Sequence, residues 1–319
     1  MKYSIIIPCY NVVGRIDRLF GMMEECSKMD CEVVFVDDCS PDDSYEQMMK
    51  MNPYPLCYKI LKTEKNMGPG GARNKGVSCS TGEYILFCDS DDWFDINVLN
   101  YIDDLLKRNK NFDTVVFPYR SCGKKTKEVD PFGLYSNEDE IPAKSAVLDS
   151  GVVWSKLFSR SIIEENNIFF PDIKNGEDRV FWTKYCCYAK RILKCNYAYY
   201  NYVKLSNSIT RTRARKNSYI EKSSFEHLED IYKEFFPEAQ VEMFVNGHLF
   251  HYVKLMCSYS YSAKSIRNWL VLQNKRYPMW IKHMNMKSQS IYRKCIYCAM
   301  YYNKPGFIKL IMFVRRIIY

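Results

Sequence analysis

Long uncharged hydrophobic runs are absent from this sequence of 319 residues. None reaches the ~18 residues that a membrane-spanning helix needs, so we expect no transmembrane segment. We also expect no signal peptide, because the first apolar run is only Ile5-Ile6-Ile7 before Pro8. The fourteen cysteines are scattered through helix-like and strand-like segments alike. Without a leader, this usage predicts reduced thiols in the cytoplasm rather than a disulfide framework.

Motifs of three common binding classes are missing as well. The chain has one C-x-x-C, from Cys295 to Cys298, whereas a zinc site of that type needs a second pair. In the glycine-rich segment 68–76, Arg73 stands where a dinucleotide fingerprint needs its third glycine, and no Lys-Ser or Lys-Thr follows Gly76. These gaps exclude a structural zinc module, a dinucleotide-binding turn and the phosphate loop of ATPases.

Acidic residues are absent from the C-terminal part of the chain. Residues 243–319 contain 13 Lys or Arg and no Asp or Glu. Because the whole chain carries +9, residues 1–242 carry a net −4. A basic region of this size is typical of proteins that meet an anionic membrane surface or nucleic acid. No nucleic-acid-binding motif accompanies it, so we expect no nucleic acid partner.

The final segment, YNKPGFIKLIMFVRRIIY, alternates apolar runs with Lys304, Lys309, Arg315 and Arg316. On a helix this pattern gives a broad apolar face with a basic rim, which suits a helix lying on an anionic bilayer. A buried C-terminal helix docked on the domain would explain the same pattern. We expect membrane binding through the basic C-terminal helices, with docking as the alternative.

Strand and helix patterns alternate over the first 109 residues. Apolar runs predict strands at 3–7, 31–38, 57–63 and 84–88. Helices are predicted at 14–28, 40–51 and 96–109, and a glycine-rich turn leading into a short helix is predicted within 66–82. Ser40 and Pro41 suit the N-cap and first position of the second helix. This alternation is typical of an α/β fold with a mostly parallel sheet flanked by helices.

Beyond residue 110 the pattern becomes mixed. We expect a strand at 112–120, helices within 151–167 and 173–192, an aromatic strand from 198 and helices from 218 onward. The segment 206–216, SNSITRTRARK, carries Arg211, Arg213 and Arg215 in a loop that could close over a diphosphate or stay a solvated charge run.

Polar residues gather where three of the predicted strands end. They are Pro8, Tyr10 and Asn11 after the first strand, Asp37 and Asp38 at the end of the second, and Asp89, Asp91 and Asp92 after the fourth. In parallel sheets, ligands bind beyond the carboxyl ends of the strands. The three clusters therefore predict one binding crevice.

The aspartates after the fourth strand repel one another, at a cost on the order of 1–4 kcal/mol per pair at ~4 Å. A calcium loop does not explain them, because Trp93 and Phe94 occupy the places of a ligand and the obligate glycine. Asp95 is placed to cap the following helix. The remaining explanation is a hard divalent cation, Mn²⁺ or Mg²⁺, shared with a phosphorylated ligand.

Four motifs stand in one order along the chain: SIIIPCYN at 4–11, VVFVDDCSPDDS at 33–44, NMGPGGARNKG at 66–76 and GEYILFCDSDDWF at 82–94. Together they resemble family 2 of the glycosyltransferases, enzymes that use nucleotide-sugars and have the GT-A fold. The resemblance is strong over residues 1–120 and looser over 150–210. It implies a mixed sheet flanked by helices and a nucleotide-sugar donor, which we expect to be a UDP-sugar.

The resemblance also assigns roles to the residues at the strand ends. Pro8, Tyr10 and Asn11 would line the nucleotide pocket, and Asp38 would contact the uracil. Arg73 would approach the aspartate cluster or the diphosphate, with a purely structural salt bridge as the alternative.

Asp89-Ser90-Asp91 would be the family's D-x-D motif. Asp91 would then lie beside the ribose or the metal. Either Asp89 or Asp92 would be the closer metal ligand, a choice that the resemblance leaves open.

The second half of the chain must supply a base. Glu177 and Asp178 stand at the start of a predicted helix, where negative charge is favourable in any case. The resemblance implies that Asp178 is the catalytic base. Glu177 would orient the acceptor or serve as the base in place of Asp178. Trp154 could stack on a sugar and Lys156 could meet a phosphate, with core packing and a solvated lysine as the alternatives.

These inferences predict a metal-dependent inverting glycosyltransferase that moves a sugar from a nucleotide-sugar to a hydroxyl of a saccharide or lipid-linked saccharide, in capsule, lipopolysaccharide or exopolysaccharide assembly. Residues 1–120 would form the nucleotide-sugar half, 121–217 the acceptor half and 218–319 a basic helical region. We expect a cytoplasmic protein, peripheral on the inner face of the cytoplasmic membrane. The alternative is an inactive nucleotide-sugar-binding or scaffold protein of the same fold.

Overall fold

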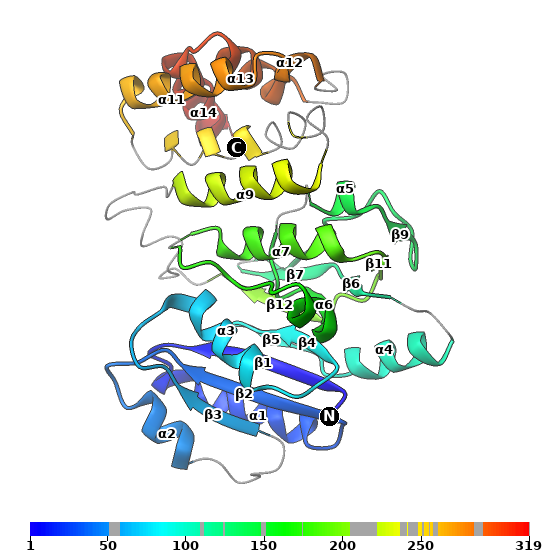
Figure 1. The fold of residues 1–319 in the computed structure, drawn as a ribbon. Helices are drawn as coiled ribbons and strands as arrows, with labels where there is room; N and C mark the ends of the chain where they lie inside the picture. Colours follow the sequence, from blue (N-terminus) through cyan, green and yellow to red (C-terminus); the bar gives the residue numbers. More distant parts are fainter. Residues whose placement is uncertain are drawn as a thin grey trace. The chain divides into compact units, whose positions relative to one another are not determined.

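A computed structural model of the chain forms two compact units, Met1–Leu205 and Ser206–Tyr319 (Figure 1). The structure describes residues 1–50, 58–108, 112–123, 125–147, 151–173, 175–204, 222–236, 241, 248–250, 252–254, 256–257, 261–283 and 290–318. Unit 1 contains the four motifs and the Glu177-Asp178 pair, so its architecture is described first.

The first four strands of unit 1 are parallel neighbours in an eight-stranded sheet. They are β1 (Tyr3–Cys9), β2 (Cys31–Asp37), β3 (Tyr58–Lys62) and β4 (Tyr84–Phe87). β1 lies between β2 and β4, and β3 lies beside β2. Their register pairs Cys9 with Asp37, so the polar residues that follow β1 and β2 leave the sheet at the same edge.

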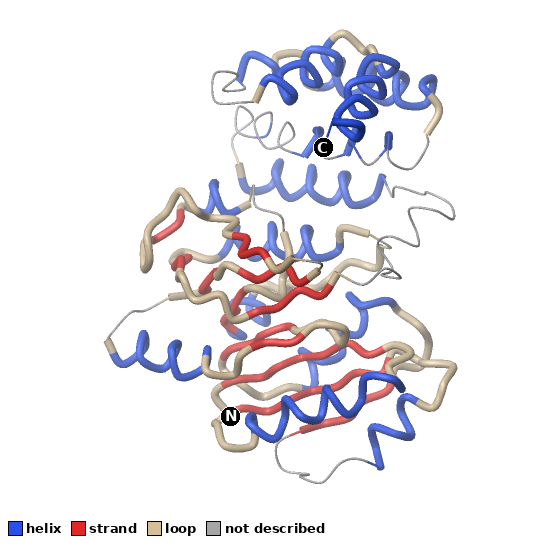
Figure 2. The backbone as a smooth tube through the Cα atoms, turned by 180° about the vertical axis from the view of Figure 1, so that it is seen from behind, coloured by secondary structure: helices blue, strands red, loops and turns tan. Residues whose placement is uncertain are grey.

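Helices connect these strands and cover both faces of the sheet. They are α1 (Ile16–Cys26), which follows a 3₁₀ turn η1 (Val13–Arg15), α2 (Ser44–Lys50) and α3 (Gly68–Cys79). Figures 1 and 2 view the sheet from opposite sides, and they show α3 on one face and α1 on the other. Both faces of β1 and β2 are consequently buried, which is why these strands read as continuous apolar runs.

The remaining strands make the sheet mixed, in the order β3-β2-β1-β4-β10-β6-β11-β9. They are β6 (Thr114–Val116), β9 (Glu140–Ile141), β10 (Lys156–Ser159) and β11 (Ile192–Lys194). β10 runs antiparallel to both β4 and β6, which it separates. The expected α/β class with a mixed, helix-flanked sheet is confirmed.

A second sheet of four strands lies in the same unit, in the order β5-β12-β7-β8. Its strands are β5 (Trp93–Phe94), β7 (Tyr119–Cys122), β8 (Lys127–Val129) and β12 (Tyr200–Val203). The single strand predicted at 112–120 is therefore two strands, β6 and β7, in different sheets. Pro118 separates them, since proline has no N–H for a ladder hydrogen bond.

Among its described residues, unit 1 has four further helices: α4 (Val98–Lys107), α5 (Ala143–Ala146), α6 (Arg160–Glu165) and α7 (Glu177–Tyr188). α4 begins after Asn97, and Asp95 does not act as its N-cap as predicted. The Asp95 carboxylate instead accepts hydrogen bonds from the Asn97 N–H at 3.0 Å and from the Tyr197 hydroxyl at 2.7 Å. It closes the turn before the helix and ties that turn to the strand region near β12.

Unit 2 is helical over the residues that the structure describes, as the sequence predicts from residue 218 onward. Its helices are α9 (Lys222–Phe235), α11 (Ala263–Arg276), α12 (Trp280–His283), α13 (Ile291–Tyr301) and α14 (Pro305–Ile318). Leu270, Trp280, Met300 and Ile308 are buried in its core. Among the described helices, none has both the length and the apolar character that crossing a bilayer requires.

Candidate active site

The loops that follow β1 and β2 are tied to each other by side-chain hydrogen bonds. Asn11 has a left-handed backbone, with φ of 54°, which asparagine tolerates better than most residues. Its N–H donates to the Ser40 hydroxyl at 3.0 Å, and the Ser40 N–H donates to Asp37 Oδ2 at 3.1 Å. The chain Asn11–Ser40–Asp37 thus holds the two strand ends in one arrangement.

This use of Ser40 overturns its predicted role as a helix cap. α2 begins at Ser44, three residues later than a cap at Ser40 implies, and Asp42 Oδ1 accepts the Ser44 N–H at 3.1 Å. The Ser44 hydroxyl accepts the Val12 N–H at 2.7 Å. Both serines of the motif SPDDS therefore hold the loop after β1, which their local sequence does not reveal.

Asp38 lies directly after β2 and is oriented by the next loop. Its Oδ1 accepts a hydrogen bond from the Thr63 hydroxyl at 3.1 Å and from the Met67 N–H at 2.8 Å. Burial raises the pKa of Asp38, although these hydrogen bonds oppose the shift. The neighbouring Asp37 is fully buried, and its Oδ1 has no hydrogen-bond partner among the described residues.

The other predicted nucleotide-pocket residues lie at the end of β1. Pro8 is half-buried within the strand, whereas the Tyr10 side chain is 41% exposed just beyond it. An exposed aromatic ring at the carboxyl edge of the sheet is available to a ligand. Ser90, in the aspartate motif, is half-buried, and its carbonyl accepts a hydrogen bond from Arg18 at 3.2 Å.

Arg73 connects the aspartate motif with the acidic pair of α7. Its side chain is 3% exposed, and its two terminal nitrogens lie 2.6 Å from Asp89 Oδ1 and 2.6 Å from Asp178 Oδ1. Burial works against the charged form, but the two carboxylates outweigh it and raise the pKa of Arg73. A buried charge held by two short, charge-assisted hydrogen bonds is strongly positioned. Asp89 and Asp178, from distant motifs, are therefore held on either side of one guanidinium.

The three aspartates after β4 form a cluster. Asp89, Asp91 and Asp92 each offer a carboxylate oxygen, and these oxygens lie within 4.8 Å of one another. Burial raises the pKa of Asp91, and the charge of Asp89 adds to that shift. Concentrated carboxylate oxygens are the donor set that Mg²⁺ or Mn²⁺ prefers.

Asp92 has a second connection within this cluster. It is fully buried, and its two oxygens accept hydrogen bonds from the Tyr200 hydroxyl and the Val203 N–H, each at 2.7 Å. The Tyr200 hydroxyl also accepts the Asp89 N–H at 3.1 Å. Burial, together with the charge of Asp89, raises the pKa of Asp92 to about 7. Asp92 therefore joins the cluster to β12, and sequence reasoning did not detect its partner Tyr200.

Glu177 and Asp178 begin α7, as predicted. Gly176 precedes them with φ of 86°, a conformation that glycine adopts without strain. Burial raises the pKa of both carboxyls, the charge of Asp178 raises that of Glu177 further, and Arg73 opposes the shift at Asp178. The pKa values of both carboxyls are thus raised above those of ordinary carboxyls, and Asp178 has a fixed cationic partner in Arg73.

Gly70 allows α3 to approach this pair closely. A Cβ at this position would lie 3.0 Å from Cβ of Phe170 and 3.1 Å from Cγ of Glu177. The Phe170 ring also lies 5.4 Å from the Arg73 guanidinium. The glycine-rich motif therefore serves close packing of α3 against the start of α7, and Phe170 is a site neighbour that no motif indicated.

Two further predicted residues of the acceptor segment lie in the interior. Trp154 is buried and stacks on Tyr200 with ring centroids 4.5 Å apart, which fits its core-packing alternative. Lys156 is 1% exposed, so it is not a solvated lysine. Its Nζ donates to the Val152 carbonyl at 2.5 Å and lies 4.5 Å from the Trp182 ring. Its positive charge also lowers the pKa of Asp178.

The basic loop with Arg211, Arg213 and Arg215 lies outside the described residues. So do the side chains of Arg315 and Arg316 near the C-terminus.

Known proteins share both the sequence pattern and the fold. A family model described as Glycosyl transferase family 2 matches residues 4–166, just over half of the chain. The chain is 32% identical over 225 residues to the poly(ribitol-phosphate) beta-glucosyltransferase of Bacillus spizizenii, covering 64% of this chain and 32% of that protein. It is 30% identical over 201 residues to the poly(ribitol-phosphate) beta-N-acetylglucosaminyltransferase TarS of Staphylococcus aureus, covering 60% of this chain and 34% of that protein. The chain thus spans about a third of the length of these two relatives.

The similarity in structure extends along the whole chain. The crystal structure of S. aureus TarS 1–349 in complex with UDP-GlcNAc has a TM-score of 0.72 and covers 99% of this chain and 92% of that one. The sequence identity of that match is 21%, so the likeness is one of fold.

Proposed function

Because the chain belongs to glycosyl transferase family 2 and has the predicted GT-A fold, we propose that it transfers a sugar from a nucleotide-sugar to a hydroxyl of a saccharide acceptor. The observation that carries this proposal is the bridge from Asp89 through Arg73 to Asp178. The buried Arg73 guanidinium holds the donor-side carboxylate of Asp89 close to the candidate base Asp178. This arrangement would bring a donor and an acceptor together for transfer.

The donor is a UDP-sugar in this proposal. Pro8, Tyr10 and Asn11 line the nucleotide side, and Asp38 accepts a hydrogen bond from the uracil ring. The Thr63 hydroxyl and the Met67 N–H orient that carboxylate, which supports a recognition role. The TarS match, whose crystal contains UDP-GlcNAc, supports the same class of donor.

The aspartate cluster fits a divalent cation. Asp89 and Asp91 would hold Mn²⁺ or Mg²⁺, since both are partly exposed and Asp89 uses only one oxygen for Arg73. Asp92 completes the cluster, but its two hydrogen bonds to β12 favour a supporting role. When bound, the cation neutralises the diphosphate and stabilises the charge on the departing UDP.

Asp178 is the catalytic base in the proposed reaction. It accepts the proton of the acceptor hydroxyl, whose oxygen forms a bond to the anomeric carbon while the bond from that carbon to the UDP oxygen breaks. Attack opposite the leaving group inverts the anomeric centre. Arg73 fixes Asp178 relative to the donor-side aspartates, and Glu177 beside it orients the acceptor or takes over as base.

The acceptor carries hydroxyls on a polymer or a lipid-linked saccharide at a membrane surface. Two relatives are named for action on poly(ribitol-phosphate), which supports a cell-wall or surface polymer as the acceptor class. The acid-free segment 243–319 supports peripheral attachment to the inner face of an anionic membrane.

A donor panel tests the proposal. UDP-, GDP- and dTDP-sugars are screened for thermal stabilisation with Mn²⁺, and nucleotide release is then measured with candidate polymer and saccharide acceptors. We expect a UDP-sugar to stabilise the protein and UDP release to require acceptor. Stabilisation without turnover on any acceptor would favour the inactive binding protein instead, and no stabilisation by any donor would overturn the proposal.

A further inference from the structure

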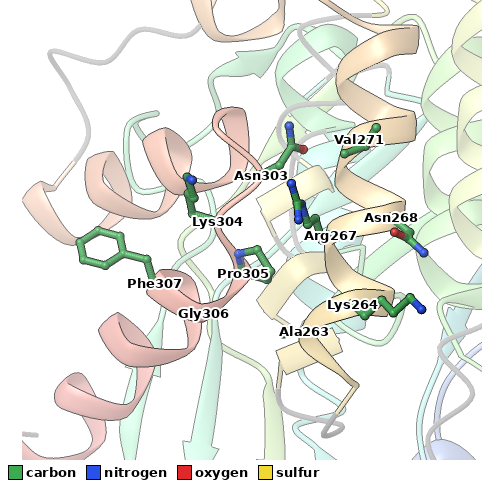
Figure 3. Close-up of a pocket in the computed structure, with 10 residues that line it drawn as sticks. All are labelled: Ala263, Lys264, Arg267, Asn268, Val271, Asn303, Lys304, Pro305, Gly306 and Phe307. Carbon is green, nitrogen blue, oxygen red and sulfur yellow. The ribbon is translucent and has the colours of Figure 1, made fainter.

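An open groove lies in unit 2 between α11 and the start of α14, with a volume of about 1120 Å³ (Figure 3). Ten residues line it: Ala263, Lys264, Arg267, Asn268, Val271, Asn303, Lys304, Pro305, Gly306 and Phe307. Three of the ten are cations and none is acidic. Figure 3 shows the Arg267 side chain rising from α11 toward Asn303 on the facing segment.

Among the described residues, no side chain pairs with the cations of the groove. The side chains of Lys264, Arg267 and Lys304 are exposed and make no hydrogen bond or ion pair with any residue that the structure describes. Other basic residues of unit 2 are engaged: Lys233 and Arg276 pair with the buried Glu229. Because residues 243–319 contain no acid, no carboxylate of that segment is available to neutralise the groove. The three charges are therefore available to an external anion.

An exposed apolar stripe continues from the groove along α14. Phe307, Leu310, Phe313 and Val314 are 53%, 54%, 61% and 43% exposed. At 3.6 residues per turn they fall within an arc of about 120° around the helix axis. The opposite side of the helix carries the buried Ile308, and the Lys309 side chain turns back to donate to the Tyr261 carbonyl at 2.6 Å. Phe307 belongs to both features, so the cationic groove and the apolar stripe form one continuous surface.

We propose that this surface binds an anionic phospholipid bilayer. Lys264, Arg267 and Lys304 contact headgroup phosphates, and the stripe of α14 enters the boundary between headgroups and acyl chains. Charge complementarity supports an anionic lipid, since the charged residues that line the groove are all positive and headgroup phosphates are negative. The adjoining exposed phenylalanines and leucine favour a bilayer over a water-soluble anionic polymer, which offers them no apolar phase. A second copy of the chain would meet the same three unpaired cations and be repelled by them.

The inference rests on the proposed work at a membrane surface and names the residues that provide the contact. Its test uses substitutions rather than a truncation of the C-terminal helices. Deleting residues 291–319 would remove buried core residues such as Ile296, Met300 and Ile308, so loss of membrane binding by that variant would not separate contact from unfolding. Substitutions at exposed positions avoid this ambiguity.

The experiment compares four variants of the full chain in flotation with vesicles. The charge variant is Lys264→Gln/Arg267→Gln/Lys304→Gln, matched by Lys75→Gln/Lys125→Gln/Lys144→Gln on exposed lysines of unit 1. The stripe variant is Phe307→Asp/Leu310→Asp, matched by Met49→Asp/Leu134→Asp at exposed positions of unit 1. Vesicles contain phosphatidylcholine alone or with phosphatidylglycerol. Circular dichroism and thermal melts confirm that each variant is folded.

We expect binding only to the vesicles with phosphatidylglycerol, weakened by salt. At ~1 kcal/mol per basic residue, about fivefold each, the charge variant should lose about 100-fold in partitioning. The stripe variant should lose at least tenfold, and both controls should bind like the natural protein.

Four results would overturn the inference. The first is equal binding to both vesicle types, and the second is binding by both test variants at control levels. The third is self-association that the stripe variant abolishes, observed in place of vesicle binding. The fourth is retention of a soluble poly(ribitol-phosphate) without vesicle binding, which would assign the groove to a polymer. UDP release on a soluble acceptor, measured for all four variants, reports the proposed transferase function separately and should not change with the groove.

Discussion

Arg73 shows how much a single residue can determine when it is buried between two carboxylates. Its side chain is 3% exposed and reaches Asp89 and Asp178 at 2.6 Å each. Two carboxylates facing each other without it would repel, and burial raises the pKa of Asp178, which Arg73 opposes. The residue thus keeps the candidate base charged as well as in position.

Replacing Asp178 with asparagine tests the base directly. Asparagine keeps the size of the side chain but cannot accept a proton, so we expect kcat to fall by about 10²–10⁴-fold. Donor binding, measured as thermal stabilisation by UDP with Mn²⁺, should remain. Glu177→Gln is the matched control with an expected smaller loss, and a larger loss there would reassign the base to Glu177.

Replacing Arg73 with alanine should destabilise the protein by about 3–5 kcal/mol, because it leaves the two carboxylates without their buried partner. Arg73 lowers the pKa of Asp178 against the effect of burial. Without it that pKa rises, so the acidic limb of the kcat/KM profile should move to higher pH. Denaturant unfolding and a pH–rate profile measure the two effects.

Arg73→Lys retains a charge and should restore part of the stability, but one ammonium does not reproduce the two-pronged contact. An unmoved acidic limb in Arg73→Ala would contradict the role of Arg73 in keeping Asp178 ionised.

At the scale of elements, buried polar side chains hold strands and loops in register. Tyr200 of β12 joins Asp92 to the second sheet, and Ser40 joins the ends of β1 and β2. Glu32 in β2 has the same role at the opposite edge of the sheet. It accepts hydrogen bonds from the Ser4 hydroxyl in β1 at 2.8 Å and from the Thr81 hydroxyl before β4 at 2.9 Å, and it pairs with Lys59 in β3 at 2.9 Å.

Glu32 should make the stability of unit 1 depend on acidic pH. Burial raises its pKa, but the Lys59, Thr81 and Ser4 hydrogen bonds prevail and lower it from 4.5 to about 2. A lowered folded-state pKa contributes stability above the unfolded value, and that stability is lost as pH falls from about 4.5 toward 2. We expect the contribution to be on the order of 1–3 kcal/mol.

Glu32→Gln should therefore be less stable than the natural protein near neutral pH, and the difference should shrink between pH 4.5 and 2. Chemical denaturation across this range measures it. Exposed Glu46→Gln is the control, with no expected change in slope. A difference that stays constant down to pH 2 would show that the carboxylate charge is not responsible.

At the scale of the whole molecule, the two units differ in composition and in proposed task. Unit 1 contains the carboxylates of the candidate active site, whereas unit 2 contains the groove cations, which have no partner among the described residues, and the exposed stripe of α14. A ligand of unit 1 should stabilise the fold that surrounds it by mass action, by about 2.7 kcal/mol at one hundred times its Kd.

Metal removal should abolish most of that stabilisation. With Mn²⁺ present, we expect UDP at this concentration to raise Tm by about 5–10 °C, given ~2–4 °C per kcal/mol for a unit of this size. In EDTA the shift should largely disappear, because the diphosphate would then face Asp89 and Asp91 without a cation between them. Differential scanning fluorimetry measures both cases, with Asp91→Asn as a variant that should lose the Mn²⁺-dependent part. An undiminished shift in EDTA would contradict the metal requirement.

Local pattern alone determined much of this protein. The alternating apolar runs and helical spacings of residues 1–108 correctly predicted β1 to β4 and the helices between them, because periodicity in a short segment reports which faces are buried. The four motifs were sufficient to identify the family, and the acid-free C-terminal segment was visible by inspection.

Only the tertiary structure decided which of these residues meet. Arg73 and Asp178 are 105 positions apart, and Asp92 and Tyr200 are 108 apart. Such contacts depend on β10 entering antiparallel between β4 and β6 and on β12 pairing with β5, which no local pattern encodes. Ser40 and Asp95 were expected as helix caps, but Ser40 anchors a loop and Asp95 closes a turn. For Trp154, whose two alternatives were stacking on a sugar and core packing, the structure fits core packing. In each case a partner distant in sequence competed for the side chain, and the geometry of the sheets determined the outcome.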